Sequence, residues 1–284
     1  MDKEKAIRLW SETEASLDLR MAEYNRNPET KWIDPFRIVG NVYYVGDRVV
    51  ACHLVDSGDG LILLDTGLPH TTELLFKRLV ALGFRLEDVR YVVHTHEHFD
   101  HFGASRELQT RFGAKMFLHK DGAETFRINP HHTELQSSQS PAALFIPDVE
   151  LEAGDTIELG DVCIESIHTP GHSAGALTYL FTTREGERDL RVGLCGVNGT
   201  LTLHAGRLFK YGIPLSTRDD YVASISKLRN YEVDITLDTH PRPGGAVDKR
   251  ELMIDNSDVN PFIDPLAWGQ TLDHYQSRFE DFVQ

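Results

Sequence analysis

The segment 89-VRYVVHTHEHFDHFG-103 places three histidines and an aspartate directly after a short apolar strand. Residues i and i+2 of an extended chain point the same way, so His96 and His98 can face one point in space. Asp100 and His101 lie on the turn just beyond and can face a second point nearby. Imidazole nitrogens together with a carboxylate oxygen are typical zinc ligands. The segment therefore predicts a metal site, and we favour this over a solvated histidine-rich loop.

Two later segments present further histidines in turns that follow apolar strands. In 169-TPGHSAG-175 a Pro-Gly turn presents His172, and in 238-DTHPRPGG-245 His240 precedes a second turn rich in proline and glycine. Either histidine alone is a weak signal, because a single histidine in a turn is usually a surface residue. The predicted ligands form two sets of three: His96, His98 and His172, and Asp100, His101 and His240. Three protein ligands per metal leave a position open for water or substrate, as catalytic zinc sites require.

Another carboxylate ends the apolar segment 62-ILLDTG-67. Asp65 could cap the glycine turn, or it could accept a hydrogen bond from a ligand imidazole and orient it. We favour the second role. His94 lies two residues before His96 on the same strand face, and we expect a packed histidine there rather than a ligand.

The rest of the chain alternates β-rich stretches with helices. Residues 36–67 are rich in Val, Ile and Tyr and predict consecutive hairpin strands, and 156–197 form a second β-rich half. Residues 121–147, with Pro130, Pro141 and Pro147, are predicted as a long loop that can contain a helical turn. Further predicted elements are an irregular amphipathic helix within 1–31, helices at 70–82, 103–112 and 219–230 and in the tail, and strands at 115–119 and 233–239. Two β-rich halves with helices outside predict one domain, 1–284, of two sheets packed face to face, with 1–31 as a helical extension.

Composition narrows the choice of partners and of cellular compartment. The chain has 284 residues and a formal net charge of −15, which repels nucleic acid and anionic membranes, so we expect a small-molecule substrate. Its three widely spaced cysteines, Cys52, Cys163 and Cys195, predict buried free thiols. The N-terminal sequence does not resemble a signal peptide, and no apolar run approaches the roughly 20 residues that span a bilayer. A cytoplasmic protein is therefore expected, and its oligomeric state is left open.

Taken in chain order, the Asp65 segment, the histidine-rich segment after the apolar strand, the His172 turn and the His240 turn resemble the metallo-β-lactamase superfamily. The resemblance extends from Phe36 to the tail. The resemblance implies a four-layer αββα fold and metal-assisted hydrolysis. Many members, such as lactonases and glyoxalase-II-like thioesterases, carry a metal-bridging Asp in the region that here reads 192-VGLCGVNGT-200, with Asn198 and no Asp. The remaining Asp-His-His set resembles the third subclass of zinc β-lactamases, as do the segments 35-PFRIVGNVYYVG-46 and NPFIDP near the end.

This resemblance implies two zinc ions per chain that activate water for attack on a cyclic amide such as a β-lactam. Asp100 is the predicted catalytic residue, which coordinates metal and orients the water or carries its proton. A lactone or thioester substrate is the alternative, although the missing bridging Asp argues against it. A non-enzymatic zinc-binding module is less favoured, because structural zinc normally has four protein ligands. Iron-dependent redox members have a carboxylate-rich site or a flavodoxin-like domain, and this sequence indicates neither.

Overall fold

The computed structural model describes residues 2–133, 144–255 and 259–283 and contains two β-sheets. The first has the order β1-β2-β3-β4-β5-β6-β7 and the second the order β12-β11-β10-β9-β8. The first sheet consists of β1 (Phe36–Val39), β2 (Val42–Tyr44), β3 (His53–Asp56), β4 (Leu61–Leu64), β5 (Val89–Val93), β6 (Lys115–His119) and β7 (Val149–Leu151). The second consists of β8 (Thr156–Leu159), β9 (Val162–His168), β10 (Leu177–Glu185), β11 (Arg188–Leu194) and β12 (Ile235–Leu237).

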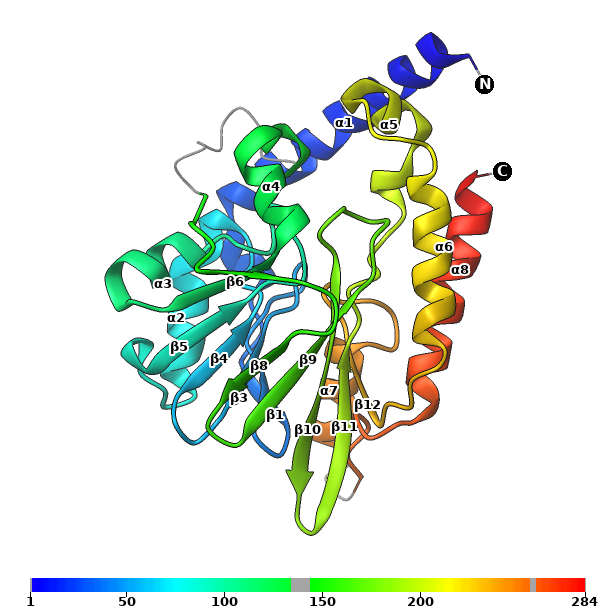
Figure 1. The fold of residues 1–284 in the computed structure, drawn as a ribbon. Coiled ribbons are helices and arrows are strands. Elements are labelled where there is room, and N and C mark those ends of the chain that lie inside the picture. The colour runs from blue at the N-terminus through cyan, green and yellow to red at the C-terminus, as the bar shows by residue number, and fades with distance from the viewer. Residues whose placement is uncertain (1, 134–143, 256–258, 284) are drawn as a thin grey trace.

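Helices cover the outer faces of both sheets (Figure 1). The described α-helices of the chain are α1 (Lys3–Arg26), α2 (Thr72–Ala81), α3 (Ser105–Phe112), α4 (Lys120–Ile128), α5 (Ala205–Tyr211), α6 (Thr217–Leu228), α7 (Ala246–Asp255) and α8 (Leu266–Val283). Figure 1 shows α2 and α3 on one side of the paired sheets and α6 and α8 on the other. The predicted four-layer αββα arrangement is therefore confirmed. No helix in the described part of the chain is long and apolar enough to cross a membrane.

Three apolar cores hold these layers together. One lies between the sheets and includes Tyr44 and Phe181, one lies under α2 and α3 and includes Leu79, and one lies under α6 and α8 and includes Trp268. All four residues of β4 are buried, because apolar side chains cover both faces of this central strand. The continuous apolar runs in the sequence reflect this burial on both sides.

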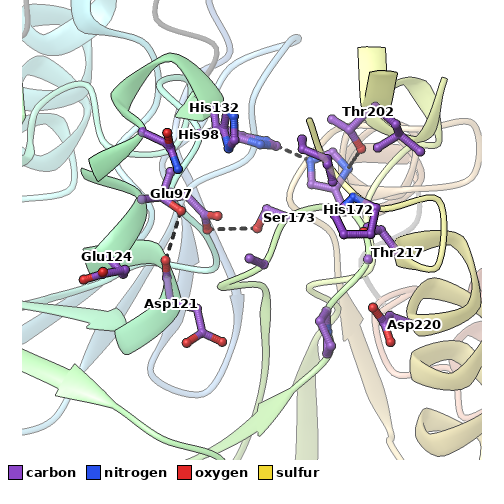
Figure 2. Close-up of a pocket in the computed structure, with 18 of the residues that line it drawn as sticks. Glu97, His98, Asp121, Glu124, His132, His172, Ser173, Thr202, Thr217 and Asp220 are labelled. Atoms are coloured by element: carbon purple, nitrogen blue, oxygen red, sulfur yellow. Dashed lines mark hydrogen bonds between the residues drawn. The ribbon is translucent and has the colours of Figure 1, made fainter. Parts of the chain in front are cut away.

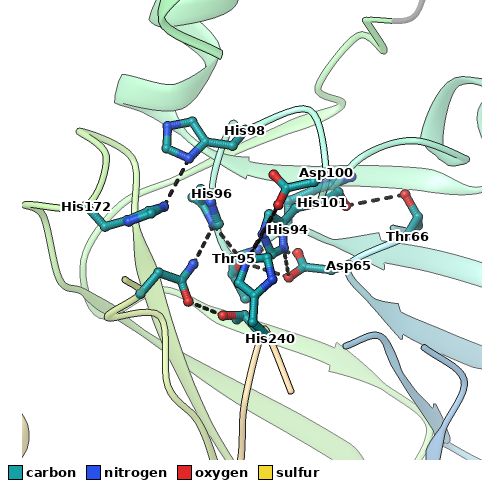
Figure 3. A network of polar contacts seen from close by, with 12 residues as sticks. Asp65, Thr66, His94, Thr95, His96, His98, Asp100, His101, His172 and His240 are labelled. Carbon is teal, nitrogen blue, oxygen red and sulfur yellow. Dashed lines mark hydrogen bonds and ion pairs between the residues drawn. The ribbon is translucent and has the colours of Figure 1, made fainter. Parts of the chain in front are cut away.

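The strand connections determine where the polar motifs emerge. Strands β1 to β4 are antiparallel neighbours, as the hairpin pattern predicts, whereas β4, β5, β6 and β7 run parallel. The ends of parallel strands meet at one edge of a sheet, so the residues that follow β4 and β5 lie side by side there. In the second sheet β12 runs parallel to β11 and delivers the segment that begins at Asp238 to the same region (Figure 3).

Helix α1 is continuous, whereas the sequence indicates an irregular helix. The Asp2 side chain accepts hydrogen bonds from the backbone of its first turn. One end of α1 packs on α5, where Gly206 is required because an added Cβ would lie 2.0 Å from the Ala6 carbonyl oxygen. Glu14 of α1 accepts a hydrogen bond from the Tyr211 hydroxyl at 2.7 Å and pairs with Lys210. Helices α5 and α7 were not predicted from the sequence.

Two predictions from the sequence are wrong. Residues 120–128 form helix α4 rather than the start of a long loop, because His119 caps the backbone amide of Asp121 and the prolines lie beyond the helix. Residues 134–143, including Pro141, lie outside the described residues. Cys163 is exposed, since it points outward from β9, whereas Cys52 and Cys195 are buried free thiols as predicted.

Buried His53 on β3 should make the free energy of unfolding depend on pH. Its ring is buried, and neither ring nitrogen has a hydrogen-bond partner in the part of the chain that the structure describes. Burial lowers the pKa of His53 from 6.5 to about 4. Between these values the unfolded chain binds a proton that the folded chain does not, so stability is present above the unfolded pKa and falls as the pH drops through this window. Replacing His53 by leucine should reduce the loss of unfolding free energy between about pH 7.5 and pH 5 by about 2 kcal/mol.

Urea unfolding of the metal-free protein at both pH values measures this difference. Exposed His131, replaced by glutamine, is the control and should leave the acid dependence as in the wild type. An acid dependence in His53→Leu equal to that of the wild type contradicts the prediction.

Candidate metal centre

Six predicted ligands meet at one end of the two sheets (Figure 3). His96, His98, Asp100 and His101 lie on the loop after β5. The loop between β9 and β10 carries His172, and the segment after β12 carries His240. Loops that follow strands of both sheets therefore build the site together.

The first predicted set is compact. His98 Nδ1 lies 3.0 Å from His172 Nε2. The ring of His96 lies 4.6 Å from that of His98 and 4.8 Å from that of His172, measured between centroids. One ligand atom from each of the three lies within 4.8 Å of the others. His172 donates from Nδ1 to the Gly199 carbonyl at 2.8 Å, which leaves its Nε2 lone pair facing the other rings.

The second predicted set faces its own centre. His101 Nδ1 donates to Asp65 Oδ2 at 2.8 Å, and His240 Nδ1 donates to the Val49 carbonyl at 2.9 Å. In the neutral rings both Nε2 atoms then carry lone pairs, and these atoms lie 3.2 Å apart. Asp100 Oδ2 lies 3.4 Å from each of them. Two lone pairs and a carboxylate pointing at one space require a cation or a proton between them.

Burial and charge support metal binding by these residues. His96 Nε2 is buried and has no protein partner among the described residues. Burial, together with the neighbouring rings, lowers the pKa of His96, and burial lowers the pKa of His172 to about 3, so both are neutral and able to act as ligands. For His101 burial acts in the opposite direction to the carboxylates of Asp100 and Asp65, which prevail and raise the pKa to about 10. Two buried imidazole sets with an unpartnered nitrogen and a facing carboxylate fit zinc ligation.

Asp65 holds the loop that carries the histidines. Its Oδ1 accepts from the Thr95 amide at 2.8 Å, and its Oδ2 accepts from the Thr95 hydroxyl at 2.7 Å and from His101. It is the only non-glycine residue with a positive φ, 59°, in the described ranges. The carboxylate contacts a predicted ligand imidazole, which agrees with the orienting role favoured from the sequence.

Several functional contacts escaped the sequence analysis. The carbonyls of Val49 and Gly199 orient His240 and His172, and a backbone carbonyl carries no residue-type signal. The Asn198 side chain lies beside the first set, with Nδ2 3.5 Å from His96 Nδ1. His94 is packed as expected: it bonds the Phe117 carbonyl and the Ser105 hydroxyl.

A cavity of about 590 Å³ opens beside the first set (Figure 2). His98 and His172 line it, and described residues of α4, of α5 and of the loop that follows α5 form its walls. Figure 2 shows Asp121 on one side, Asp220 on the other and Ser173 between them. Among the described lining residues Arg207 is the only Lys or Arg. The volume is suitable for a small organic molecule.

Comparison with known proteins identifies the family. A family model described as the metallo-beta-lactamase superfamily matches residues 45–183, which include β3 to β9 and the HxHxDH segment. A solved subclass B3 metallo-beta-lactamase of Bradyrhizobium japonicum matches 89% of this chain and 95% of its own, with 28% identity and a TM-score of 0.80. The chain belongs to the metallo-beta-lactamase superfamily. Both the fold and the family support a hydrolase with a metal site.

The curated relatives of this chain include proteins with other names. A probable metallo-hydrolase of Burkholderia pseudomallei is 32% identical over 52% of this chain and 53% of its own length. A hydroxyacylglutathione hydrolase of Bradyrhizobium sp. is 25% identical over 57% of this chain and 51% of its own length. The chain therefore spans about half the length of these curated relatives, whereas it matches the B3 structure almost throughout.

Proposed function

We propose that this protein is a dinuclear zinc hydrolase that opens a β-lactam or a related cyclic amide. The observation that carries the proposal is the composition of the second set. The loop at 195–200 brings Asn198 beside His96 and contributes no carboxylate, so Asp100, His101 and His240 remain as the second ligand set. The likeness to a subclass B3 metallo-beta-lactamase over nearly its whole length supports the same assignment.

In this proposal His96, His98 and His172 hold one zinc ion and the second set holds the other. Zinc at such sites polarises a carbonyl oxygen and lowers the pKa of water to about 7. The neighbouring histidines hold the pKa of Asp100 well below its usual range, against the effect of burial, so it is ionised. Asp100 can then accept a hydrogen bond from the attacking water and orient it towards the carbonyl. Water adds to the carbonyl carbon, the ring C–N bond breaks, and the nitrogen takes up a proton.

The cavity can hold a substrate beside His98 and His172, between these ligands and the residues of α4 and α5. Arg207 is the single Lys or Arg among the described lining residues, and its guanidinium, held by the Thr202 and His132 carbonyls, is the fixed positive charge that can favour a substrate carboxylate. Because the remaining charges at the cavity are acidic, we expect slower turnover of anionic β-lactams than in an enzyme dedicated to them.

Thioester or lactone hydrolysis is the second candidate. The specific observation in its favour is that a curated relative is a hydroxyacylglutathione hydrolase, a protein named for hydrolysis of a glutathione thioester. The same ligand sets and cavity can serve any activated carbonyl that fits beside them.

A substrate panel decides between these activities. The zinc-loaded protein should contain about two metal equivalents by elemental analysis, from two three-ligand sets. It should open the ring of a chromogenic cephalosporin or of a carbapenem, with chelator abolishing turnover, because the attacking water depends on bound metal. Circular dichroism in chelator is the control, since loss of activity without unfolding separates a catalytic from a purely structural metal. Chelator-sensitive cleavage of a lactone or thioester, without turnover of either β-lactam, moves the assignment to the second candidate.

A further inference from the structure

The C-terminal part of α1 is joined to the body of the protein through a buried hydrogen bond. The Tyr24 hydroxyl donates to Asp47 Oδ2 at 2.5 Å. Tyr24 is 6% exposed and Asp47 is 4% exposed, so water does not compete freely for this contact. The His70 ring packs edge-on against the Tyr24 ring at 4.9 Å and fixes its orientation.

Asp47 organises the turn that follows β2. Its Oδ1 accepts from the backbone amides of Val49 at 2.7 Å and Val50 at 2.9 Å. Its own carbonyl accepts from the Tyr44 hydroxyl at 2.6 Å. The Asp47 carboxylate therefore connects α1 on one side with the backbone of the turn on the other.

The same turn holds the segment that carries His240. The Val49 carbonyl accepts from His240 Nδ1 at 2.9 Å, and the Ala51 amide donates to the Thr239 carbonyl at 2.9 Å. Figure 3 shows His240 facing Asp100 and His101 from below. Nothing else that the structure describes bonds Nδ1 of His240, so the position of the Val49 carbonyl sets the direction of the opposite ring nitrogen.

We infer that Tyr24 is a positioning residue for the second metal set and acts on His240 through Asp47 and the Val49 carbonyl. This rests on the proposed function only in that the second set binds a metal. Without the hydroxyl, the buried Asp47 side chain has one donor fewer, and the turn gains freedom. Removing a group that bonds a ligand directly typically changes metal affinity about 10- to 100-fold, so Tyr24, which acts through Asp47 and Val49, should change it about 3- to 10-fold. The first set is anchored elsewhere, through the Gly199 carbonyl, and is unaffected.

The test compares two single-hydroxyl deletions that each remove one hydrogen bond of α1. Tyr24→Phe removes the hydroxyl that bonds Asp47, whereas Tyr211→Phe removes the hydroxyl that bonds Glu14 and has no connection to His240. Metal-free proteins are titrated with Co²⁺ and followed by visible absorbance and calorimetry. Tyr24→Phe should bind the first equivalent as the wild type does and the second about 3- to 10-fold more weakly. Tyr211→Phe should bind both as the wild type does.

A double-mutant cycle keeps the test decisive if Tyr24→Phe is destabilised. Asp47→Asn keeps the oxygen that accepts from Val49 and Val50 but removes the charge. If Tyr24 acts through Asp47, the two substitutions together weaken the second equivalent by less than the product of their separate effects.

Each outcome bears on one claim. A wild type that binds only one equivalent contradicts the proposed dinuclear site. A wild type that binds two, with Tyr24→Phe equal to it or weakened at both equivalents alike, overturns the positioning role and leaves the proposed function intact. Independent effects of the two substitutions in the cycle also overturn it.

Discussion

Replacing Asp65 by alanine is expected to lower the free energy of unfolding by about 3–5 kcal/mol, even without metal. The substitution leaves the Thr95 amide and hydroxyl and the His101 Nδ1 without their acceptor in a buried place. It also puts alanine at φ 59°, which costs roughly 1–2 kcal/mol that asparagine and glycine largely avoid. Denaturant unfolding in the presence of chelator measures the loss directly.

Asp65→Asn is the matched control for backbone conformation. Asparagine tolerates the left-handed region and keeps one oxygen for the Thr95 amide, but its nitrogen cannot accept from His101. The free energy of unfolding of Asp65→Asn should lie between those of the wild type and of Asp65→Ala. A loss below about 1 kcal/mol in Asp65→Ala would show that the carboxylate is not the buried anchor that its contacts indicate.

Removing the His240 imidazole is expected to remove one of two metal equivalents and to lower kcat/KM by at least about 100-fold, more than the loss of a residue that only orients a ligand. The second set would retain only Asp100 and His101, and the 195–200 loop contributes no carboxylate to replace it. His240→Ala should keep the first equivalent, because His98 and His172 still face each other. Elemental analysis and steady-state kinetics provide the two readouts.

The exposed His131, replaced by alanine, is the control for loss of an arbitrary histidine and should keep both equivalents. Asn198→Ala discriminates between ligand assignments, since Asn198 lies beside His96 of the first set. If Asn198→Ala lost the second equivalent while His240→Ala kept it, the assignment of the second set would be wrong.

The candidate site could be predicted largely from the sequence because side chains of a few chemical types end apolar strands. The alternation along a strand brings His96 and His98 to one side, and parallel neighbours bring Asp65 beside their loop. Segments that follow strands of the second sheet then deliver His172 and His240. The fold class followed from the same reasoning, since two β-rich halves must bury their apolar faces against each other.

What the sequence did not reveal depends on backbone groups and on distant contacts. The Val49 carbonyl, which orients His240, is defined by the shape of a turn and not by its side chain. Helix α4 was mistaken for a loop because nearby prolines suggested irregular structure, although they lie beyond its last turn. Arg207 lines the cavity only because α1 and the preceding loop set the position of α5.

The position of α1 also has a consequence for biosynthesis. At about 5–20 residues per second, α1 leaves the ribosome roughly 10–40 s before α5 is synthesised. Only Ala6, Trp10 and Tyr24 of this helix are buried in the folded protein, so the emerging helix has little apolar surface with which to associate early. The contact of its N-terminal half with α5 can therefore form only after α5 has been made, whereas the Tyr24 contact with Asp47 needs only residues that are made soon after the helix.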